Sequence, residues 1–281
     1  MMKELKKLWL LPLLLVGQTA SVHAQEVRST DTAMKLKPAV NTPIVKKPVV
    51  KKPKPITSEI SGGFRLNTDG WGIFVDKGWV KSEEKERDYF YNTQLLQIEF
   101  GEKKHPKEIK RSNNIGSGAD KAKPFIFGKI NNFYALKFGY GGRKMIAGKP
   151  EQGNVSIHWV YLGGLSLGLQ KPYYLIVQPN GESARTIKYS DTTAEIFLTR
   201  NYIIGGAGLS QGLGEVQIIP GAHLKTGFHF DFAASKFTKM AVEVGANAEF
   251  YTKDIELMAL QKATPYLFNF YAAVQFGKRK Q

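Results

Sequence analysis

Hydrophobic and polar residues alternate with a period of two along much of the chain after residue 58. In residues 265–277, Tyr266, Phe268 and Phe270 lie on one parity, and Asn269 and Gln275 lie on the other. Successive side chains of a β-strand point to opposite faces, so this segment predicts a strand with one apolar and one mixed face. Residues 222–233 and 240–251 show the same alternation. All three segments are 12 or 13 residues long, which suits a tilted strand that crosses a membrane.

Six weaker segments bring the number of candidate strands to nine. They are residues 60–67, 70–80, 93–100, 134–140, 155–169 and 193–203. A single-chain bacterial barrel with both termini on one side has an even number of strands. Either 193–203 or 70–80 is therefore not a full strand, which gives eight, or 173–178 adds a tenth. We favour eight strands, a number at which side chains fill the barrel interior.

The distribution of charges distinguishes the two faces of these strands. Arg65, Lys225, Asp231, Glu243 and Glu249 all lie on the polar parity. A soluble sandwich would turn this parity to water, whereas a membrane barrel would turn it to the lumen and its apolar parity to lipid. Strand length and an N-terminal export signal favour the barrel. Aromatic residues near strand ends also favour it, as an interfacial girdle: Trp71, Tyr140, Phe250, Tyr251, Tyr266 and Phe276.

The first 57 residues predict two segments that precede the barrel. Residues 1–24 combine three early lysines, a short apolar run and small residues before Gln25, the layout of a cleaved signal peptide. Residues 35–55 hold five prolines, seven lysines and no acid, which predicts an extended arm that cannot form a core. The expected organisation is a signal peptide (1–24), a disordered Lys/Pro-rich linker (25–57) and an antiparallel transmembrane β-barrel (58–281).

Composition excludes several kinds of chemistry and locates the positive charge. The 281 residues include no cysteine, so disulfide bonds, thiolate metal sites and cysteine nucleophiles are excluded. The net charge is +16, of which +2 lies in residues 1–24 and +6 in residues 25–57. In an exported protein this charge indicates contact with anionic envelope components rather than with nucleic acid.

Several stretches of the sequence resemble small outer-membrane β-barrel proteins of Bacteroidota. These are the Lys/Pro-rich linker, residues 67–78 (NTDGWGIFVDKG), 99–113, 123–146 and the strand ending in Phe276. The resemblance covers most of residues 58–281 and is greatest with uncharacterised members. It implies an outer-membrane location in a Gram-negative envelope, and it supplies no catalytic motif.

The polar parity supplies the candidate site, a lumen network. If residues 234–238 close a hairpin so that paired residue numbers sum to 472, His229 faces Glu243, His223 faces Glu249 and Lys225 faces Asn247. The network hypothesis comprises Arg65, His223, Lys225, His229, Asp231, Glu243 and Glu249. Such a network would fill the barrel, and a proton-linked or ligand site is the alternative.

Two further groups of residues are candidates for binding or chemistry. A basic loop is predicted from Lys103, Lys104, Lys107, Lys110 and Arg111, with lipopolysaccharide phosphates, an acidic envelope protein or solvent as its surroundings. Ser156 and His158 share a strand face, with Ser166 beyond, so a Ser/His pair of an acyl hydrolase or transferase is conceivable. No orienting acid follows from the sequence, and we expect no enzyme, no metal and no cofactor.

These observations predict an outer-membrane barrel that acts as a structural or interaction component of the envelope. Its arm would lie in the periplasm and contact a protein or an anionic surface, and its partners would include outer-membrane lipid and lipopolysaccharide. The alternatives are a small porin-like or ligand-conducting channel and, third, a lipid-modifying enzyme.

Overall fold

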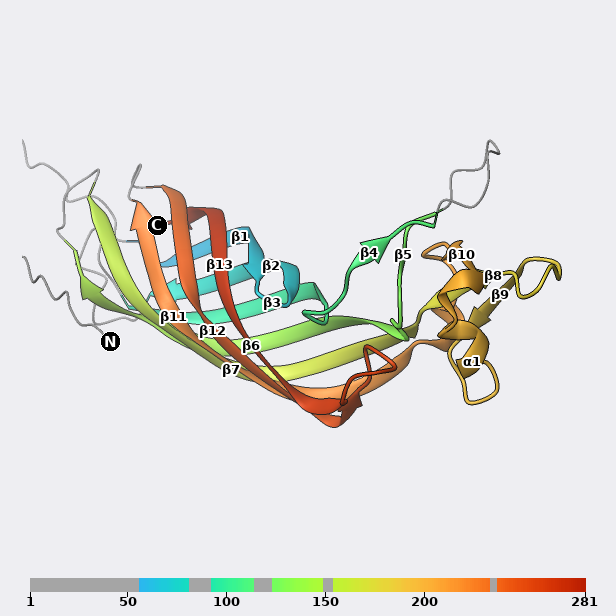
Figure 1. Ribbon diagram of the computed structural model, residues 1–281. Coiled ribbons are helices and arrows are strands. Elements are labelled where there is room, and N and C mark those ends of the chain that lie inside the picture. Colours follow the sequence, from blue (N-terminus) through green and yellow to red (C-terminus); the bar gives the residue numbers. More distant parts are fainter. Residues whose placement is uncertain (1–55, 81–91, 114–122, 149–153, 233–236) are drawn as a thin grey trace, which may run out of the picture. The chain divides into compact units, whose positions relative to one another are not determined.

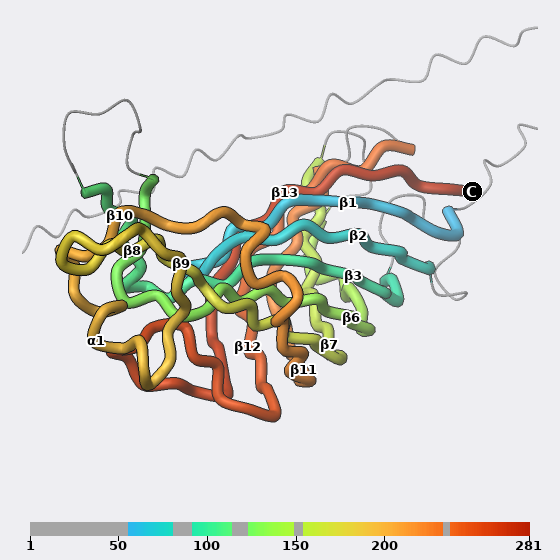
Figure 2. The backbone as a smooth tube through the Cα atoms, turned by 90° about the vertical axis from the view of Figure 1, so that its right-hand side faces the viewer, coloured from blue at the N-terminus to red at the C-terminus, as the bar shows by residue number. Residues whose placement is uncertain are grey.

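The computed structural model describes residues 56–80, 92–113, 123–148, 154–232 and 237–281. Its main body is a closed barrel of eight antiparallel strands (Figures 1 and 2). Around the barrel these strands are β1 (Ser58–Asn67), β2 (Gly70–Val80), β3 (Thr93–Lys103), β6 (Asn131–Ala147), β7 (Val155–Pro172), β11 (Gln217–Phe232), β12 (Thr238–Ile255) and β13 (Thr264–Lys280).

The barrel closes where the first strand pairs with the last. Ser58 of β1 lies opposite Lys280 of β13, and Asn67 lies opposite Tyr271. Closure leaves no strand edge unpaired, which a hydrocarbon environment requires. If one starts at Gly62 and moves from each residue to its partner on the next strand, one passes once around the barrel and arrives at Tyr266 on β13. Gly62 itself, however, pairs with Phe276 of β13. This offset of ten residues is the stagger that tilts the strands relative to the barrel axis.

The two faces of the strands differ as the alternation predicts. On β2, Ile73 and Val75 are 52% and 56% exposed, whereas Phe74 and Asp76, which alternate with them along the strand, are buried. On β13, Phe268 is 61% exposed and Asn269 is 1% exposed. The outer surface is therefore an apolar band, and the polar side chains are enclosed in the lumen. This arrangement confirms the transmembrane-type barrel fold.

The strand count is eight, and the structure identifies the segment that is not a strand. Residues 70–80 form barrel strand β2, whereas residues 193–203 hold the helical turns α1 (Ala194–Phe197) and η2 (Arg200–Tyr202). Residues 174–177 form a strand, β8 (Tyr174–Val177), but it lies in a separate sheet and not in the barrel. The ten-strand alternative is therefore wrong.

Three of the connections at one end of the barrel fold together. They contain β4 (Lys110–Arg111), β5 (Phe125–Ile126), β8, β9 (Arg185–Lys188), β10 (Ile203–Gly206), α1, η2 and η3 (Leu213–Glu215). Strands β10, β8 and β9 form one small sheet, and β4 pairs with β5. We call the described parts of residues 104–130, 173–216 and 256–263 the loop subdomain.

The loop subdomain has its own hydrophobic core. Phe125, Leu175, Val177, Phe197 and Ile203 are each fully buried and pack in one cluster. These residues come from two connections that are far apart in sequence, and Ala259 from a third packs against them. The loops therefore stabilise one another independently of the polar barrel interior.

At the other end of the barrel, β1 begins and β13 ends. The connections there fall at residues 81–92, 148–154 and 233–237, most of which lie outside the described residues, as do the predicted signal peptide and all of the linker except Ile56 and Thr57. Among the helices in the described part of the chain, none is long and apolar enough to cross a membrane.

Candidate functional site

The centre of the lumen is organised around the carboxylate of Glu243 on β12. It accepts hydrogen bonds from Lys225 Nζ at 3.1 Å and Tyr271 OH at 3.0 Å, and it contacts His229 Nδ1 at 3.1 Å. Arg65 Nη2 lies 3.6 Å from the same carboxylate. Glu243 is 1% exposed, so nearby protein groups, and not water, compensate its charge.

Arg65 spans the lumen from β1 and is completely buried. Its guanidinium lies between two aromatic rings, 4.6 Å from the centroid of Phe74 and 4.5 Å from that of Tyr271. It also forms an ion pair with Glu99 and a hydrogen bond of 3.5 Å to Gln97. Ring faces attract cations, so this packing fixes the guanidinium in the middle of the barrel.

A second layer lies toward the loop subdomain, around Glu249. Lys103 and Lys137 approach its carboxylate at 2.8 and 3.1 Å, and Tyr251 OH donates to it at 2.8 Å. Lys137 is also paired with Glu99 at 2.7 Å, which joins this layer to the central one.

A third layer lies toward the end of the barrel where β1 begins and β13 ends. Glu59 accepts from Arg143 at 2.6 Å and from Lys239 at 2.5 Å, and Arg143 also pairs with Asp76. A small cavity there has a volume of about 10 Å³, which is room for about one water molecule.

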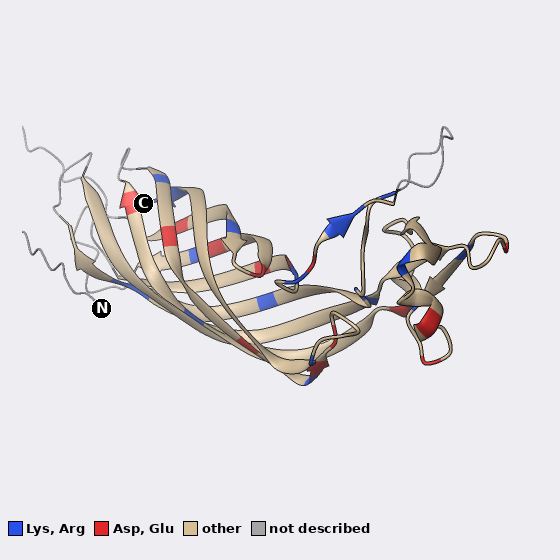
Figure 3. Cartoon of the chain, in the orientation of Figure 1, with Lys and Arg blue, Asp and Glu red and all other residues tan. Residues whose placement is uncertain are grey.

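Among the described residues, the charges of the lumen network balance. Seven cations take part: Arg65, Lys103, Lys137, Arg143, Lys225, Lys239 and Arg279. Seven carboxylates face them, counting Asp69 in the β1–β2 turn: Glu59, Asp69, Asp76, Glu99, Asp231, Glu243 and Glu249. Figure 3 shows positions of both signs on the same barrel strands.

The structure places all seven predicted network residues in the lumen, but some of them contact other partners than the predicted ones. The register pairs His229 with Glu243, His223 with Glu249 and Lys225 with Asn247, as the turn position predicted. The His223 ring, however, bonds Ser166 and the Lys225 ammonium reaches Glu243 and Gln97. Asp231 is separate from the centre and pairs with Arg279.

Sequence reasoning missed much of this network. Among the missed residues are Glu59, Asp76, Glu99, Lys137, Arg143, Lys239 and Arg279, which are all buried on inward-facing strand positions. Glu99 and Lys137 already lay on the polar parity of their predicted strands. A charge on the polar parity was therefore the signal that could have found them.

One of the predicted basic-loop residues belongs to a barrel strand. Lys103 is the last residue of β3, is 2% exposed and points inward to Asp69 and Glu249. The strand continues beyond its predicted end at residue 100, so the alternation carries Lys103 to the inner face. Lys104 is half exposed beside Glu102, and Lys107 donates to Gln261. Lys110 and Arg111 form the short strand β4.

The serine and histidine residues of β7 are all enclosed. Ser156 and His158 are 4% and 6% exposed, and the His158 ring lies edge-on to His229 with 6.1 Å between centroids. A serine–histidine hydrogen bond forms between Ser166 Oγ and His223 Nδ1, at 3.0 Å. This placement favours a structural role for these side chains.

Four of the six residues predicted for an aromatic girdle lie on the outer face of the barrel. Tyr140, Phe250, Tyr266 and Phe276 are 54–58% exposed on the outer face. Tyr251 instead points inward, where its ring lies edge-on to Phe133 at 5.2 Å.

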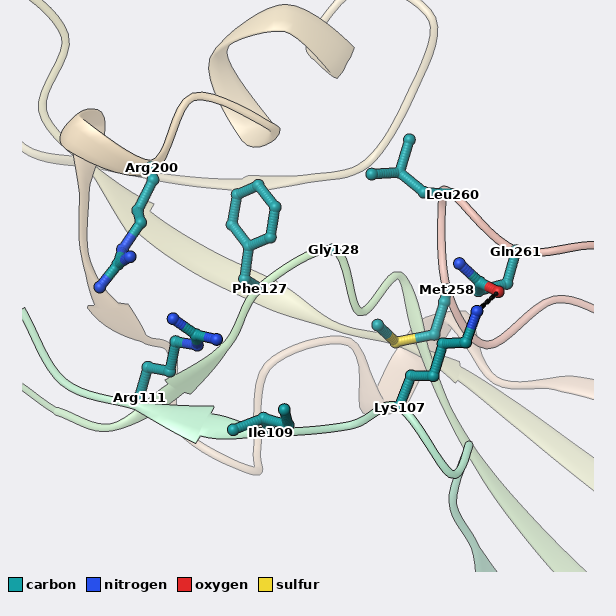
Figure 4. A pocket seen from close by; sticks show the side chains of 9 residues that line it. All are labelled: Lys107, Ile109, Arg111, Phe127, Gly128, Arg200, Met258, Leu260 and Gln261. Carbon is teal, nitrogen blue, oxygen red and sulfur yellow. Dashed lines mark hydrogen bonds between the residues drawn. The ribbon is translucent and has the colours of Figure 1, made fainter. Parts of the chain in front are cut away.

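The loop subdomain carries a recess that the sequence did not indicate (Figure 4). We call it the basic recess; it is lined by three cations and by apolar side chains, chiefly Lys107, Arg111, Arg200, Phe127, Met258 and Leu260. Next to the recess residue Phe127 in the sequence, the Ile126 amide donates a hydrogen bond to the Tyr173 phenol oxygen at 3.2 Å. Burial raises the pKa of Tyr173, so this phenol stays neutral.

The described residues hold no cluster of three or more His, Cys, Asp or Glu side chains that could bind a metal ion. The carboxylates of the lumen are instead paired with lysine and arginine.

Comparison with known proteins identifies similar folds and no family. No family model matches the chain, and no curated protein matches it. The N-terminal β-barrel domain of Pseudomonas aeruginosa OprF aligns over 81% of this chain and 100% of that domain, with 10% identity and a TM-score of 0.30. Neisserial surface protein A aligns over 79% of this chain and 94% of its own, with 9% identity and a TM-score of 0.31. The attachment invasion locus protein Ail of Yersinia pestis aligns over 80% and 99%, with 10% identity and a TM-score of 0.35.

Proposed function

We propose that this chain is an outer-membrane barrel of a Gram-negative envelope that anchors the loop subdomain at the cell surface as a structural or interaction component. The apolar outer band supports membrane insertion, since lipid is the medium that such a band requires. The resemblance of residues 67–78 and 123–146 to small outer-membrane barrels of Bacteroidota supports the same location.

The orientation follows from the lengths of the connections. Outer-membrane barrels have short periplasmic turns and longer extracellular loops. The connections that hold the loop subdomain are the long ones, so we place this end outside the cell. The Lys/Pro-rich arm (25–57), which precedes β1 in the sequence, would then lie in the periplasm.

The filled lumen is the observation that carries the proposal. Arg65, Lys225 and Glu243 meet at the centre of the barrel and are each at most 4% exposed. A solute would have to displace this paired network, so the barrel acts as an anchor and its specific contacts belong to the segments outside the strands. The same closure argues against the porin-like alternative.

Conductance in planar bilayers tests this proposal. The purified chain should give little current above the bare bilayer, whereas a general porin in the same preparation should give clear steps. A steady open channel from the wild-type chain would refute the anchor. A variant that opens the centre, Arg65→Ala with Glu243→Ala, serves to show that insertion itself is detectable.

We further propose that the arm contacts an envelope protein or an anionic surface. Its seven lysines and five prolines between residues 35 and 55 give an extended, cationic segment. Crosslinking and affinity capture from cells should recover a partner with the full chain and lose it when residues 25–57 are deleted downstream of the signal. An identical set of captured proteins from both chains would contradict this role.

We also propose that the barrel has no lipid-modifying activity. Ser156, His158, Ser166 and His223 are enclosed by the barrel wall, away from acyl chains. Incubation of the purified chain with labelled lipid A should leave its acyl groups intact, and acyl loss that Ser166→Ala abolishes would overturn this assignment.

A further inference from the structure

The basic recess brings three connections of the barrel to one place. Lys107 and Arg111 come from the β3–β6 connection, Arg200 comes from η2 in the β7–β11 connection, and Met258 and Leu260 come from the β12–β13 connection. The cavity has a volume of about 370 Å³, which is in the range of small-molecule sites.

The positive charge of the recess is not balanced by its lining. No carboxylate lines it, and neither Arg111 nor Arg200 forms an ion pair with any described residue. The adjacent acid, Glu108, is already neutralised by Lys129 at 2.8 Å, with both side chains at most 4% exposed. Two guanidinium groups at one recess repel each other unless an anion lies between them.

The backbone around the two arginines is held in place. Asn113 Nδ2, two residues after Arg111, donates to the carbonyl oxygens of Arg200 and Ile203 at 3.2 and 2.8 Å. In Figure 4 the guanidinium ends of Arg111 and Arg200 point toward one another. The fold therefore holds two positive groups close together, although no negative group among the described residues pairs with either of them.

The other side of the recess is apolar. Leu260 and Ile109 are 67% and 58% exposed, and Phe127 and Met258 complete the surface beside them (Figure 4). These residues lie outside the barrel strands, so contact with membrane lipid through the outer band does not account for them. Exposed apolar side chains next to convergent charged groups are typical of a ligand site.

We propose that the basic recess binds a small organic anion, a phosphate or carboxylate carried on an apolar body. Arg111 and Arg200 hold the oxyanion, because the planar guanidinium fork matches its geometry. Phe127, Met258 and Leu260 pack against the apolar body, and Lys107, oriented by Gln261 at 2.8 Å, adds positive charge at the rim. This site goes beyond the anchoring role and does not depend on it, since it would exist in a barrel that also conducted.

Calorimetric titration of the full chain in uncharged detergent micelles tests the site, with phenyl phosphate, inorganic phosphate and phenol as probes. Phenyl phosphate should bind, inorganic phosphate should bind more weakly, and phenol should give no signal. Arg111→Gln and Arg200→Gln should each weaken phenyl phosphate by about tenfold or more, the usual effect of losing a charge-assisted hydrogen bond. The matched control is Arg185→Gln, an exposed arginine of the same subdomain that is paired with Glu182.

A second variant separates the two halves of the site. Leu260→Ser should weaken phenyl phosphate and leave inorganic phosphate unchanged, because it alters only the apolar contact. Vesicles that contain phosphatidate distinguish the source of the anion. Competition by the vesicles would indicate a lipid headgroup, and its absence would indicate a soluble ligand; both results support the site.

Two results would overturn the proposal. One is the absence of phenyl phosphate binding at millimolar concentrations; the other is equal binding by the wild type and both arginine variants. Amide spectra of the loop subdomain establish that each variant is folded. Failure here leaves the conductance result untouched, so the two proposals can be judged separately.

Discussion

Replacing Glu243 with glutamine tests whether the charge network of the lumen holds the barrel together. The substitution keeps the shape of the side chain and removes one buried negative charge. The carbonyl oxygen of the new amide would still accept from Lys225 and Tyr271 and would still lie beside Arg65, but its amino group would replace the carboxylate oxygen that contacts His229. The carboxylate is 1% exposed, so water cannot replace the lost charge.

The magnitude follows from the contacts that are lost. A hydrogen bond to a charged group contributes about 1.5–3 kcal/mol; the substitution alters the contact with His229 and removes the negative charge that Lys225 and Arg65 face. The cost should therefore be about 3–5 kcal/mol, the range typical of a buried ion pair that loses one member. Arg65 keeps Glu99, and Lys225 keeps Gln97 at 2.9 Å, which limits the loss.

Urea unfolding from phospholipid vesicles measures this difference, with tryptophan fluorescence as the signal. Trp79 and Trp159 are 40% and 43% exposed on the outer face, so their emission reports on transfer from lipid to water. The matched control is Glu182→Gln in the loop subdomain, where the side chain is 58% exposed and 3.6 Å from Arg185. Exposed pairs contribute less than about 1 kcal/mol, so this variant should unfold like the wild type.

Two results decide the case. If Glu243→Gln and Glu182→Gln both stay within about 1 kcal/mol of the wild type, the network does not stabilise the barrel and the reasoning is refuted. If Glu243→Gln is costly, adding Lys225→Met should recover part of the loss, because it removes a buried cation that has lost its counter-charge. A double-mutant cycle should then show coupling of about 0.5–3 kcal/mol.

Three further predictions concern the outer face, the loop core and a close strand contact. Ile98→Lys should cost about 2–4 kcal/mol in vesicle unfolding, because it places a charge in lipid, whereas Leu213→Lys in the loop subdomain should cost almost nothing. Phe197→Ala should destabilise the loop core by about 3–5 kcal/mol. Proteases should then cleave the loops faster, while the unfolding transition of the barrel stays unchanged. Leu213→Ala, at an exposed position, should leave the cleavage rate unaltered. Gly245→Ala should destabilise the barrel by about 1–3 kcal/mol, because a Cβ at this position would lie 2.2 Å from a carbonyl oxygen of β11. The control is Gly214→Ala, since a Cβ at Gly214 would meet nothing within 4 Å. Equal urea midpoints for the two variants would contradict this prediction.

The alternation of side chains was sufficient to predict the barrel, and its failures have physical causes. Ile73, Val75 and Phe268 could be assigned to the outer face because a period of two needs only local sequence. The strand prediction for residues 193–203 failed since Phe197 and Ile203 are buried in the loop core, where no sheet imposes a period. Lys103 was misplaced because the length of β3 is set by its pairing with β2 and β6, which the local pattern does not contain.

The contacts within the candidate sites could not be predicted in the same way. Arg65 on β1 meets Glu99 on β3, and this meeting depends on the register of β1, β2 and β3 and on side-chain reach. Arg111 and Arg200 are 89 positions apart in sequence and are joined through Asn113. Each of these pairs depends on non-local geometry, so the sequence could supply the residue types but not their partners.

The balance of charge in the lumen explains where the positive charge of the chain can act. Residues 58–281 carry a net charge of +8 after the +2 and +6 of the preceding segments are removed. The seven cations and seven carboxylates of the lumen network cancel one another, as their ion pairs show. The excess must therefore lie outside this network, in the connections and strand ends, and in the described part of the chain Arg111 and Arg200 are two positions where it is not paired. Because the barrel interior is neutral and closed, the surface charge of the loops is the part of residues 58–281 that can recognise an anion.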